Sequence, residues 1–146
     1  MMVDQRCVPS GANSTTTVQG IDEVLREAWD RGIVLGGSSA GSLCWFEEGT
    51  TDSRPKELTR VEGLGFLRGS HSPHYDAEES RRPAYHELIR TGALKPGYAC
   101  DNNAGIYFED NEVRRVIHTR PEAKVYRVSL VDGEIVEEEL PAQMIE

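Results

Sequence analysis

Apolar residues recur at steps of three and four positions from Thr17 onwards, which is the spacing of one face of a helix. Asp22 and Glu23 fall in the first turn of this segment, and Arg31 stands before Gly32, so both ends carry the charges and stop signals of a helix. The pattern predicts an amphipathic helix from Thr17 to the residues before Gly32. Its apolar positions are Val18, Ile21, Val24, Leu25, Ala28 and Trp29.

The aliphatic run 33–35 follows directly and is bounded by glycines, which is typical of a strand buried on both faces of a parallel sheet. A glycine- and serine-rich segment, 36–42, comes next, and the apolar residues 43–46 resume a helical pattern. The stretch 47–60 is polar. The sequence therefore predicts a buried strand, a sharp turn, a second helix and a loop.

Later segments predict one more helix and several strands. Pro73 excludes a helix around it, so the segment 70–76 and its histidines should form a strand end or loop. Pro83 is acceptable at the first position of a helix, which Gly92 would end. Two hairpins are predicted, formed by residues 106–108 with 113–118 and by residues 125–131 with 134–140, the second around Asp132-Gly133.

The length and net charge of the chain indicate how many domains it has and which partners it is expected to lack. A chain of 146 residues with 38% hydrophobic residues suits a single α/β domain, 1–146, of three layers. Its 16 basic and 25 acidic residues give a net charge of −9, and the basic residues are scattered, which argues against a nucleic-acid partner. No apolar stretch suits a membrane span or a secretory signal, so we expect a cytoplasmic protein.

The three cysteines, Cys7, Cys44 and Cys100, are far apart and lack the spacing of a zinc site or a disulfide framework. We therefore expect reduced thiols and no zinc site built from them.

Residues 37–41 match the pattern G-x-S-x-G and lie between the predicted buried strand and the predicted helix. This is the context in which a serine sits on a sharp turn with its hydroxyl exposed. Small neighbours are needed because the backbone of such a serine is strained. Ser39 is therefore the candidate nucleophile, and the backbone N–H of Ala40 is a candidate oxyanion donor. A glycine-rich turn that only binds an anion is the alternative.

A serine nucleophile needs a base, and His74 is the best placed of the four histidines because the preceding Pro73 restrains its backbone. His71 and His74 with Asp76 would make only half of a metal site, so we expect no metal. The carboxylate that would orient the imidazole is not determined by spacing. Asp52, Asp76 and Asp101 all fall in predicted loops.

Three segments together resemble the peptidase E family, the serine peptidases of aspartyl dipeptidase and cyanophycinase type. They are residues 34–46, residues 69–76 and residues 97–108, and the resemblance runs from about Gly20 to Val128. It implies a doubly wound, three-layer, mostly parallel sheet like that of class I glutamine amidotransferases, here with C-terminal β-hairpins and a shortened N-terminal portion.

The resemblance also implies roles for individual residues. The family's nucleophile falls on Ser39, its histidine base on His74, and an aspartate of its catalytic machinery on Asp52. The triad acid aligns with Asn102, and an amide would stabilise an imidazolium less than a carboxylate does, so Asp101 is the substitute to consider.

Two further roles follow from the same resemblance. The family's other oxyanion donor lies in a turn that residues 11–14 echo, which points to Gly11, and the family's substrate-binding arginine maps onto Arg81. A guanidinium there would hold the side-chain carboxylate of an N-terminal aspartate.

The resulting hypothesis is a cofactor-free serine peptidase that hydrolyses small peptides. Two alternatives remain open: a truncated, inactive relative that binds a ligand or partner, and an esterase or amidase. An amidotransferase is disfavoured because that chemistry uses a cysteine nucleophile. Strands missing before the first helix would expose an apolar edge, so we expect self-association, most simply as a dimer.

Overall fold

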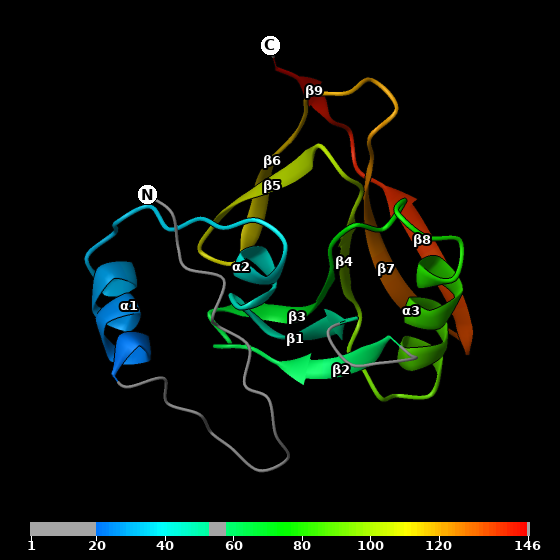
Figure 1. Cartoon of the computed structure of the whole chain (residues 1–146), viewed down its shortest axis with the longest axis horizontal. Coiled ribbons are helices and arrows are strands. Elements are labelled where there is room, and N and C mark those ends of the chain that lie inside the picture. The colour runs from blue at the N-terminus through cyan, green and yellow to red at the C-terminus, as the bar shows by residue number, and fades with distance from the viewer. Residues whose placement is uncertain (1–19, 53–57, 146) are drawn as a thin grey trace.

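The computed structural model describes residues 20–52 and 58–145. Most described strands form a six-stranded sheet in the order β2-β1-β3-β4-β7-β8, and β5, β6 and β9 form a second, three-stranded sheet (Figure 1). The helices are α1 (Ile21–Asp30), α2 (Ala40–Leu43) and α3 (Arg81–Arg90). The strands are β1 (Phe46–Thr51), β2 (Thr59–Glu62), β3 (Leu67–Ser72), β4 (Gly97–Cys100), β5 (Ala104–Glu109), β6 (Glu112–His118), β7 (Val125–Val131), β8 (Glu134–Glu139) and β9 (Gln143–Met144).

The large sheet is mixed. Strand β3 runs parallel to both β1 and β4, whereas β2, β7 and β8 pair antiparallel with their neighbours. The carboxyl ends of β1, β3 and β4 therefore meet at one edge, which is where open α/β sheets place ligands. The chain has an α/β fold, as predicted.

Several elements lie where the pattern predicts them. The helix predicted near Pro83 is α3, and its buried face, Tyr85 and Ile89, packs with Leu94 of the following loop and with Ala99 and Val128 of the sheet. Both predicted hairpins form, as β5 with β6 and as β7 with β8. The segment around Pro73 is the end of β3 and the loop after it. The predicted first helix is α1 from Ile21 onwards, with Gly20 as its N-cap, and its predicted positions 17–19 lie outside the described residues.

The prediction of a buried strand at 33–35 is wrong. This run lies outside every described strand, and Val34 is 82% exposed. A β-branched run becomes a buried strand only where neighbouring strands satisfy its backbone and layers cover both faces. Among the described residues, no strand pairs with it.

The predicted helix over 43–46 and loop over 47–60 are also wrong. The helix after the turn ends at Leu43, Phe46 already belongs to β1, and residues 59–62 form β2. Packing explains the difference, because Trp45 and Phe46 are buried with Phe66 and Leu67 rather than along one helix face.

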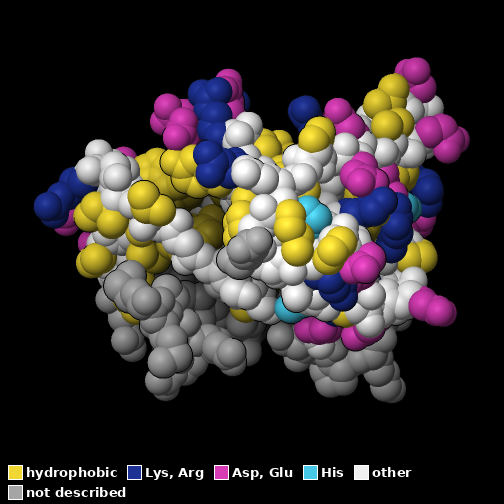
Figure 2. Space-filling model, turned by 90° about the horizontal axis from the view of Figure 1, so that it is seen from above, with side chains coloured by type: hydrophobic (Ala, Val, Ile, Leu, Met, Phe, Trp, Pro, Cys, Tyr) yellow, Lys and Arg dark blue, Asp and Glu magenta, His cyan; other side chains and the backbone are white. Residues whose placement is uncertain are grey.

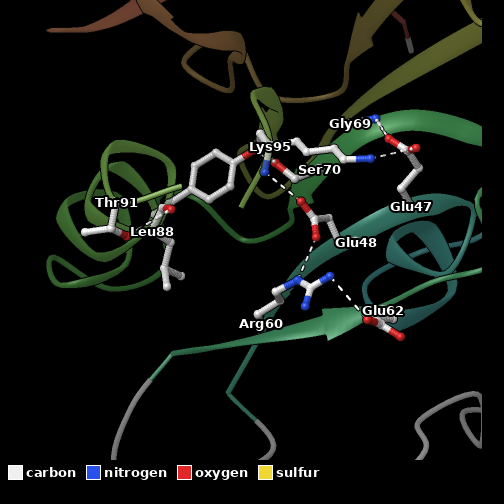
Figure 3. Close-up of polar contacts among 10 residues, drawn as sticks. Glu47, Glu48, Arg60, Glu62, Gly69, Ser70, Leu88, Thr91 and Lys95 are labelled. Carbon is white, nitrogen blue, oxygen red and sulfur yellow. Dashed lines mark hydrogen bonds and ion pairs between the residues drawn. The ribbon is translucent and has the colours of Figure 1, made fainter. Parts of the chain in front are cut away.

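Both glutamates of β1 accept hydrogen bonds from charged or backbone donors, and one of them, Glu48, is buried. The Glu48 carboxylate, 4% exposed, accepts hydrogen bonds from Arg60 Nε at 2.6 Å and from the Lys95 N–H at 2.6 Å (Figure 3). Glu47 accepts one from the Gly69 N–H at 2.7 Å. A buried carboxylate needs such partners, so this network fixes β1 against β2 and β3.

Helix α1 leaves much of its apolar face uncovered. Leu25 and Trp29 pack against the cluster around Trp45, but Val24 is 65% exposed. Figure 2 shows hydrophobic side chains gathered at the end of the molecule where Figure 1 places α1. Within the described residues, no helix is long and apolar enough to cross a membrane.

Candidate active site

Ser39 lies on a tight turn between residues 33–35 and α2, and its backbone has φ 56° and ψ −123°. Of six described non-glycine residues with positive φ, four are Asn or Asp, which tolerate this region, and the others are Ser39 and His74. A Cβ at Gly37 would lie 1.9 Å from the Gly41 carbonyl oxygen, whereas one at Gly41 would meet nothing within 4 Å. The turn thus requires glycine at position 37 alone.

His74 lies in the loop after β3 and reaches Ser39 across the turn. Its Nε2 is 2.8 Å from Ser39 Oγ, within hydrogen-bond distance. The structure therefore brings together the two side chains that the sequence analysis selected as nucleophile and base.

Asn102 contacts the other side of the imidazole. Its Oδ1 lies 2.6 Å from His74 Nδ1, in the turn that follows β4. Because β3 and β4 are parallel neighbours, the loops after both strands meet at the same edge. A side-chain carbonyl oxygen can only accept a hydrogen bond, so Nδ1 carries the proton and Nε2 is left to accept one from Ser39.

Asp76 holds the Asn102 turn in place. Its carboxylate accepts a hydrogen bond from the Asn102 backbone N–H at 2.7 Å and one from Arg120 at 2.5 Å. Partial burial alone would raise the pKa of Asp76, but these hydrogen bonds outweigh it and hold the pKa below its ordinary value. A charged carboxylate is thereby fixed beside the loop that carries His74.

Asp101, which was considered as the group that orients the His74 imidazole, has a different partner in the structure. Its carboxylate accepts a hydrogen bond from the Lys124 backbone N–H at 2.9 Å, and burial raises its pKa. The group that meets the His74 ring is Asn102, one residue further on. Of these two neighbours, only Asn102 contacts the imidazole in the structure.

Asp52 pairs with Arg81 rather than with the imidazole. Arg81 is 4% exposed and donates to Asp52 Oδ2 at 2.6 Å, which holds the pKa of Asp52 below its ordinary value. Both residues line a pocket of about 80 Å³ together with Ser39 and His74. The remaining lining residues are Ala40, Leu43, Cys44, Thr50, Thr51, Val61, Glu62 and Pro73.

The two candidate oxyanion donors fare differently. Ala40 is the first residue of α2, and its backbone N–H has no backbone acceptor among the described residues. Gly11, the other candidate, lies outside the described residues.

A polar cluster beyond the pocket restrains the residue after His74. Tyr75, 3% exposed, donates from its hydroxyl to Glu137 Oε1 at 2.5 Å. Glu137, in β8, also contacts His86 at 2.8 Å and pairs with Arg82 of α3. The loop that carries His74 is thus attached to α3 and to β8.

Comparison with known proteins identifies the family of the chain. The model of peptidase family S51 matches residues 14–116. The chain belongs to peptidase family S51. A relative described as the uncharacterized peptidase YgaJ of Bacillus subtilis (strain 168) is 48% identical over 126 residues, which are 86% of this chain and 54% of that protein. The chain therefore spans about half the length of this relative.

Sequence reasoning missed the pocket wall that β1 and β2 supply to this S51 chain. Thr50, Val61 and Glu62 line the pocket, but they fall in or beside the stretch that was predicted to be a loop. The β-branched residues Thr50 and Thr51 were the available signal for a strand. The two glutamates and the glycine that precede Thr50 interrupt this strand pattern and made the stretch resemble a polar loop.

Proposed function

We propose that this chain is a serine peptidase that hydrolyses small peptides through an acyl-enzyme on Ser39, with His74 as general base and Asn102 as its orienting partner. One observation carries the proposal: a continuous chain of hydrogen-bond contacts joins Ser39 Oγ, His74 and Asn102 Oδ1 at 2.8 and 2.6 Å. The arrangement of a nucleophile, a histidine and an amide also occurs in proteases with a Cys-His-Asn triad.

Acylation starts with the proton of the Ser39 hydroxyl. His74 Nε2 takes this proton as Oγ attacks the carbonyl carbon of the scissile peptide bond. The negative charge that develops on the carbonyl oxygen is stabilised by the Ala40 N–H. The imidazolium then gives its proton to the leaving amine, the C–N bond breaks, and an ester remains on Ser39.

Deacylation repeats these steps with water. His74 removes a proton from a water molecule that attacks the ester carbonyl, and it returns the proton to Ser39 Oγ as the C–O bond breaks. The acid product leaves and the hydroxyl is restored. Throughout, Asn102 holds the ring in one tautomer, but its neutral amide stabilises the imidazolium less than a carboxylate would.

Substrates with an N-terminal aspartate suit the pocket. Arg81 lines it while nearly fully buried, and within the described residues its Nε has no hydrogen-bond partner. A buried guanidinium nitrogen without a partner favours an anion, and a substrate carboxylate supplies one in a planar geometry. Asp52, whose side chain is 63% exposed, would turn outward to admit it.

We also propose that the chain adopts the three-layer arrangement of class I glutamine amidotransferases. The position of Ser39 directly before α2 supports this. A crystal structure in which one of the two faces of the large sheet carries no helix would contradict it.

A fluorophosphonate probe tests the serine mechanism. We expect the chain to be labelled, Ser39→Ala to abolish labelling, and His74→Ala to slow it by about 10²-fold or more. Ser129→Ala, which changes a serine on β7, is the control and should label at the rate of the unsubstituted chain. Failure of the unsubstituted chain to react would favour the inactive, ligand-binding alternative.

The substrate class is tested separately with Asp-Xaa dipeptides, Ala-Xaa dipeptides and simple esters. We expect hydrolysis of Asp-Xaa to be preferred, and Arg81→Met to lower kcat/KM for Asp-Xaa by at least about tenfold while leaving ester hydrolysis nearly unchanged. Equal loss on all substrates would assign Arg81 a structural role instead.

A further inference from the structure

A second histidine of the loop motif, His71, is buried behind the nucleophile turn and takes no part in the proposed reaction. It is 3% exposed, lies in β3, and its ring stacks on Phe46 with the ring centroids 4.8 Å apart. Its Nδ1 lies 3.1 Å from the Tyr98 carbonyl oxygen, and its Nε2 lies 3.0 Å from Ser42 Oγ. Both ring nitrogens therefore have polar partners.

The partner atoms determine where the protons lie. The Tyr98 carbonyl can only accept a hydrogen bond, so the proton of a neutral His71 ring is on Nδ1. Burial lowers the pKa of His71 to about 4, so the ring is neutral at pH 7. Its Nε2 then carries a lone pair, and the group that faces it is the Ser42 hydroxyl.

The Ser42 hydroxyl has one hydrogen and two acceptors in reach. Ser39 carbonyl oxygen lies 2.7 Å from Ser42 Oγ, but this oxygen already accepts hydrogen bonds from the backbone N–H groups of Ser42 and Leu43. The buried Nε2 of His71 has only the hydroxyl as donor among the described residues. An unpaired buried acceptor is costly, so the hydrogen goes to Nε2.

We propose that His71 is a positioning residue that holds the nucleophile turn through Ser42. Ser42 lies in α2, a helix of four residues whose first N–H, that of Ala40, is the proposed oxyanion donor. The positive φ of Ser39 is strained and persists only where its surroundings hold it. The hydrogen bond from Ser42 to His71 attaches this short helix to β3.

The same strand leads directly to the base. His71 lies in β3 and His74 in the loop after it, so a single strand fixes both the helix that carries the nucleophile and the imidazole that activates it. The hydrogen bond between Ser42 and His71, called the brace below, therefore helps to set the separation between Ser39 Oγ and His74 Nε2. Proton transfer depends on this separation. The inference rests on the proposed serine mechanism.

The kinetic test compares substitutions at both ends of the brace. We expect Ser42→Ala and His71→Leu to lower kcat and the rate of fluorophosphonate labelling about tenfold with KM changed less than about twofold, because the chemical step loses alignment and the pocket is kept. His71→Gln, whose Oε1 can accept from Ser42, should recover most of the rate. Ser70→Ala is the matched control, since it removes another buried hydroxyl of β3 whose partners are Tyr85 and Lys95.

Two spectroscopic measurements do not depend on activity. Nitrogen NMR of the histidines at pH 7 should show His71 protonated on Nδ1 and unprotonated on Nε2. Hydrogen exchange of the Leu43 amide, which bonds the Ser39 carbonyl, should accelerate about tenfold in Ser42→Ala and stay unchanged in Ser70→Ala.

The outcomes separate the two proposals. A chain that reacts with the probe, but whose rate and Leu43 exchange are unaffected by Ser42→Ala, overturns the brace and leaves the serine mechanism intact. A proton found on Nε2 of His71 also overturns it. If the unsubstituted chain fails to react, the proposed function is lost, and the tautomer and exchange results still decide whether the brace exists.

Discussion

At the scale of single residues, sequence motifs identify some of the site residues, whereas local backbone geometry determines the others. Ser39 and His74 could be selected from sequence because G-x-S-x-G and a proline-restrained histidine each have a mechanical reason, and the structure places them 2.8 Å apart. The third member could not be selected. Successive residues of a turn point in different directions, so Asp101 meets Lys124 while Asn102 meets His74.

The amide at position 102 predicts an unusual response to substitution. Asn102→Asp should raise the rate of acylation about tenfold, because a carboxylate that accepts from His74 Nδ1 stabilises the imidazolium more than an amide does. Asn102→Ala should lower the rate by a similar factor. Both are measured as probe labelling rates at pH 8.

Asp101→Asn is the matched control for this experiment, since it changes the neighbouring side chain without touching the imidazole. If Asn102→Asp is labelled no faster than the unsubstituted chain, the group at position 102 does not control the rate by stabilising the His74 imidazolium.

His71 predicts a pH dependence of stability. Burial lowers its folded-state pKa from 6.5 to about 4, so between these values the unfolded chain binds a proton that the folded chain does not. The free energy of unfolding should therefore fall as the pH drops from 6.5 towards 4, by roughly 3 kcal/mol from this group alone, and stay level above 6.5.

Urea unfolding at pH 7 and pH 4.5 measures this contribution when the chain is compared with His71→Gln. Other carboxyl groups titrate in both proteins, so the difference between the two slopes isolates His71. An equal loss of unfolding free energy in both proteins between pH 7 and pH 4.5 would mean that His71 has the same pKa in the folded and the unfolded chain, and would contradict the prediction.

Among the elements, the two hairpins were predicted correctly because each strand pairs with the strand next to it in sequence. Helix α3 was also predicted, because its own ten residues carry the helical pattern, although its buried face packs on Val128 of the distant strand β7. Residues 33–35 and 43–46 have patterns that depend on distant neighbours. Residues 33–35 would be buried only if strands paired on either side of them, and no described strand does so. In the segment 43–46, packing against Phe66 and Leu67 favours a strand that begins at Phe46 over a helix.

The nucleophile turn predicts opposite effects for its two glycines. Gly37→Ala should prevent the turn from forming, since its Cβ would lie 1.9 Å from the Gly41 carbonyl oxygen, and we expect labelling to be lost. Gly41→Ala has open space and lies in α2, where alanine is favoured over glycine by about 1 kcal/mol.

Labelling rate and Tm of both variants check this pair. Gly41→Ala should keep the rate of the unsubstituted chain with an equal or higher Tm. If both variants keep the labelling rate, the contact at position 37 does not constrain the turn. If both lose it, the prediction that position 41 tolerates a Cβ is wrong.

On the scale of the whole molecule, the exposed apolar surface matters most. Ile21 and Val24 of α1 and the neighbouring Ile33 and Val34 are between 46% and 82% exposed. Uncovered apolar surface of this kind is typical of an interaction site. The sequence predicted an exposed apolar edge of this kind and its burial by a second copy of the chain.

We expect the chain to self-associate through this surface. Val24→Lys and Val34→Lys should each shift sedimentation at micromolar concentration towards the monomer, because a lysine charge would be buried in the contact. Val131→Lys, which alters an apolar residue 51% exposed at the end of β7, is the control and should not change the distribution. A monomeric unsubstituted chain would contradict the prediction.

The attachment of Tyr75 to Glu137 has a consequence for the order in which the molecule becomes competent. Glu137 belongs to β8, which is synthesised long after Ser39 and His74, and it can take the Tyr75 hydroxyl only once β8 has paired with β7. The loop that carries His74 is therefore anchored to β8 only after this hairpin has formed.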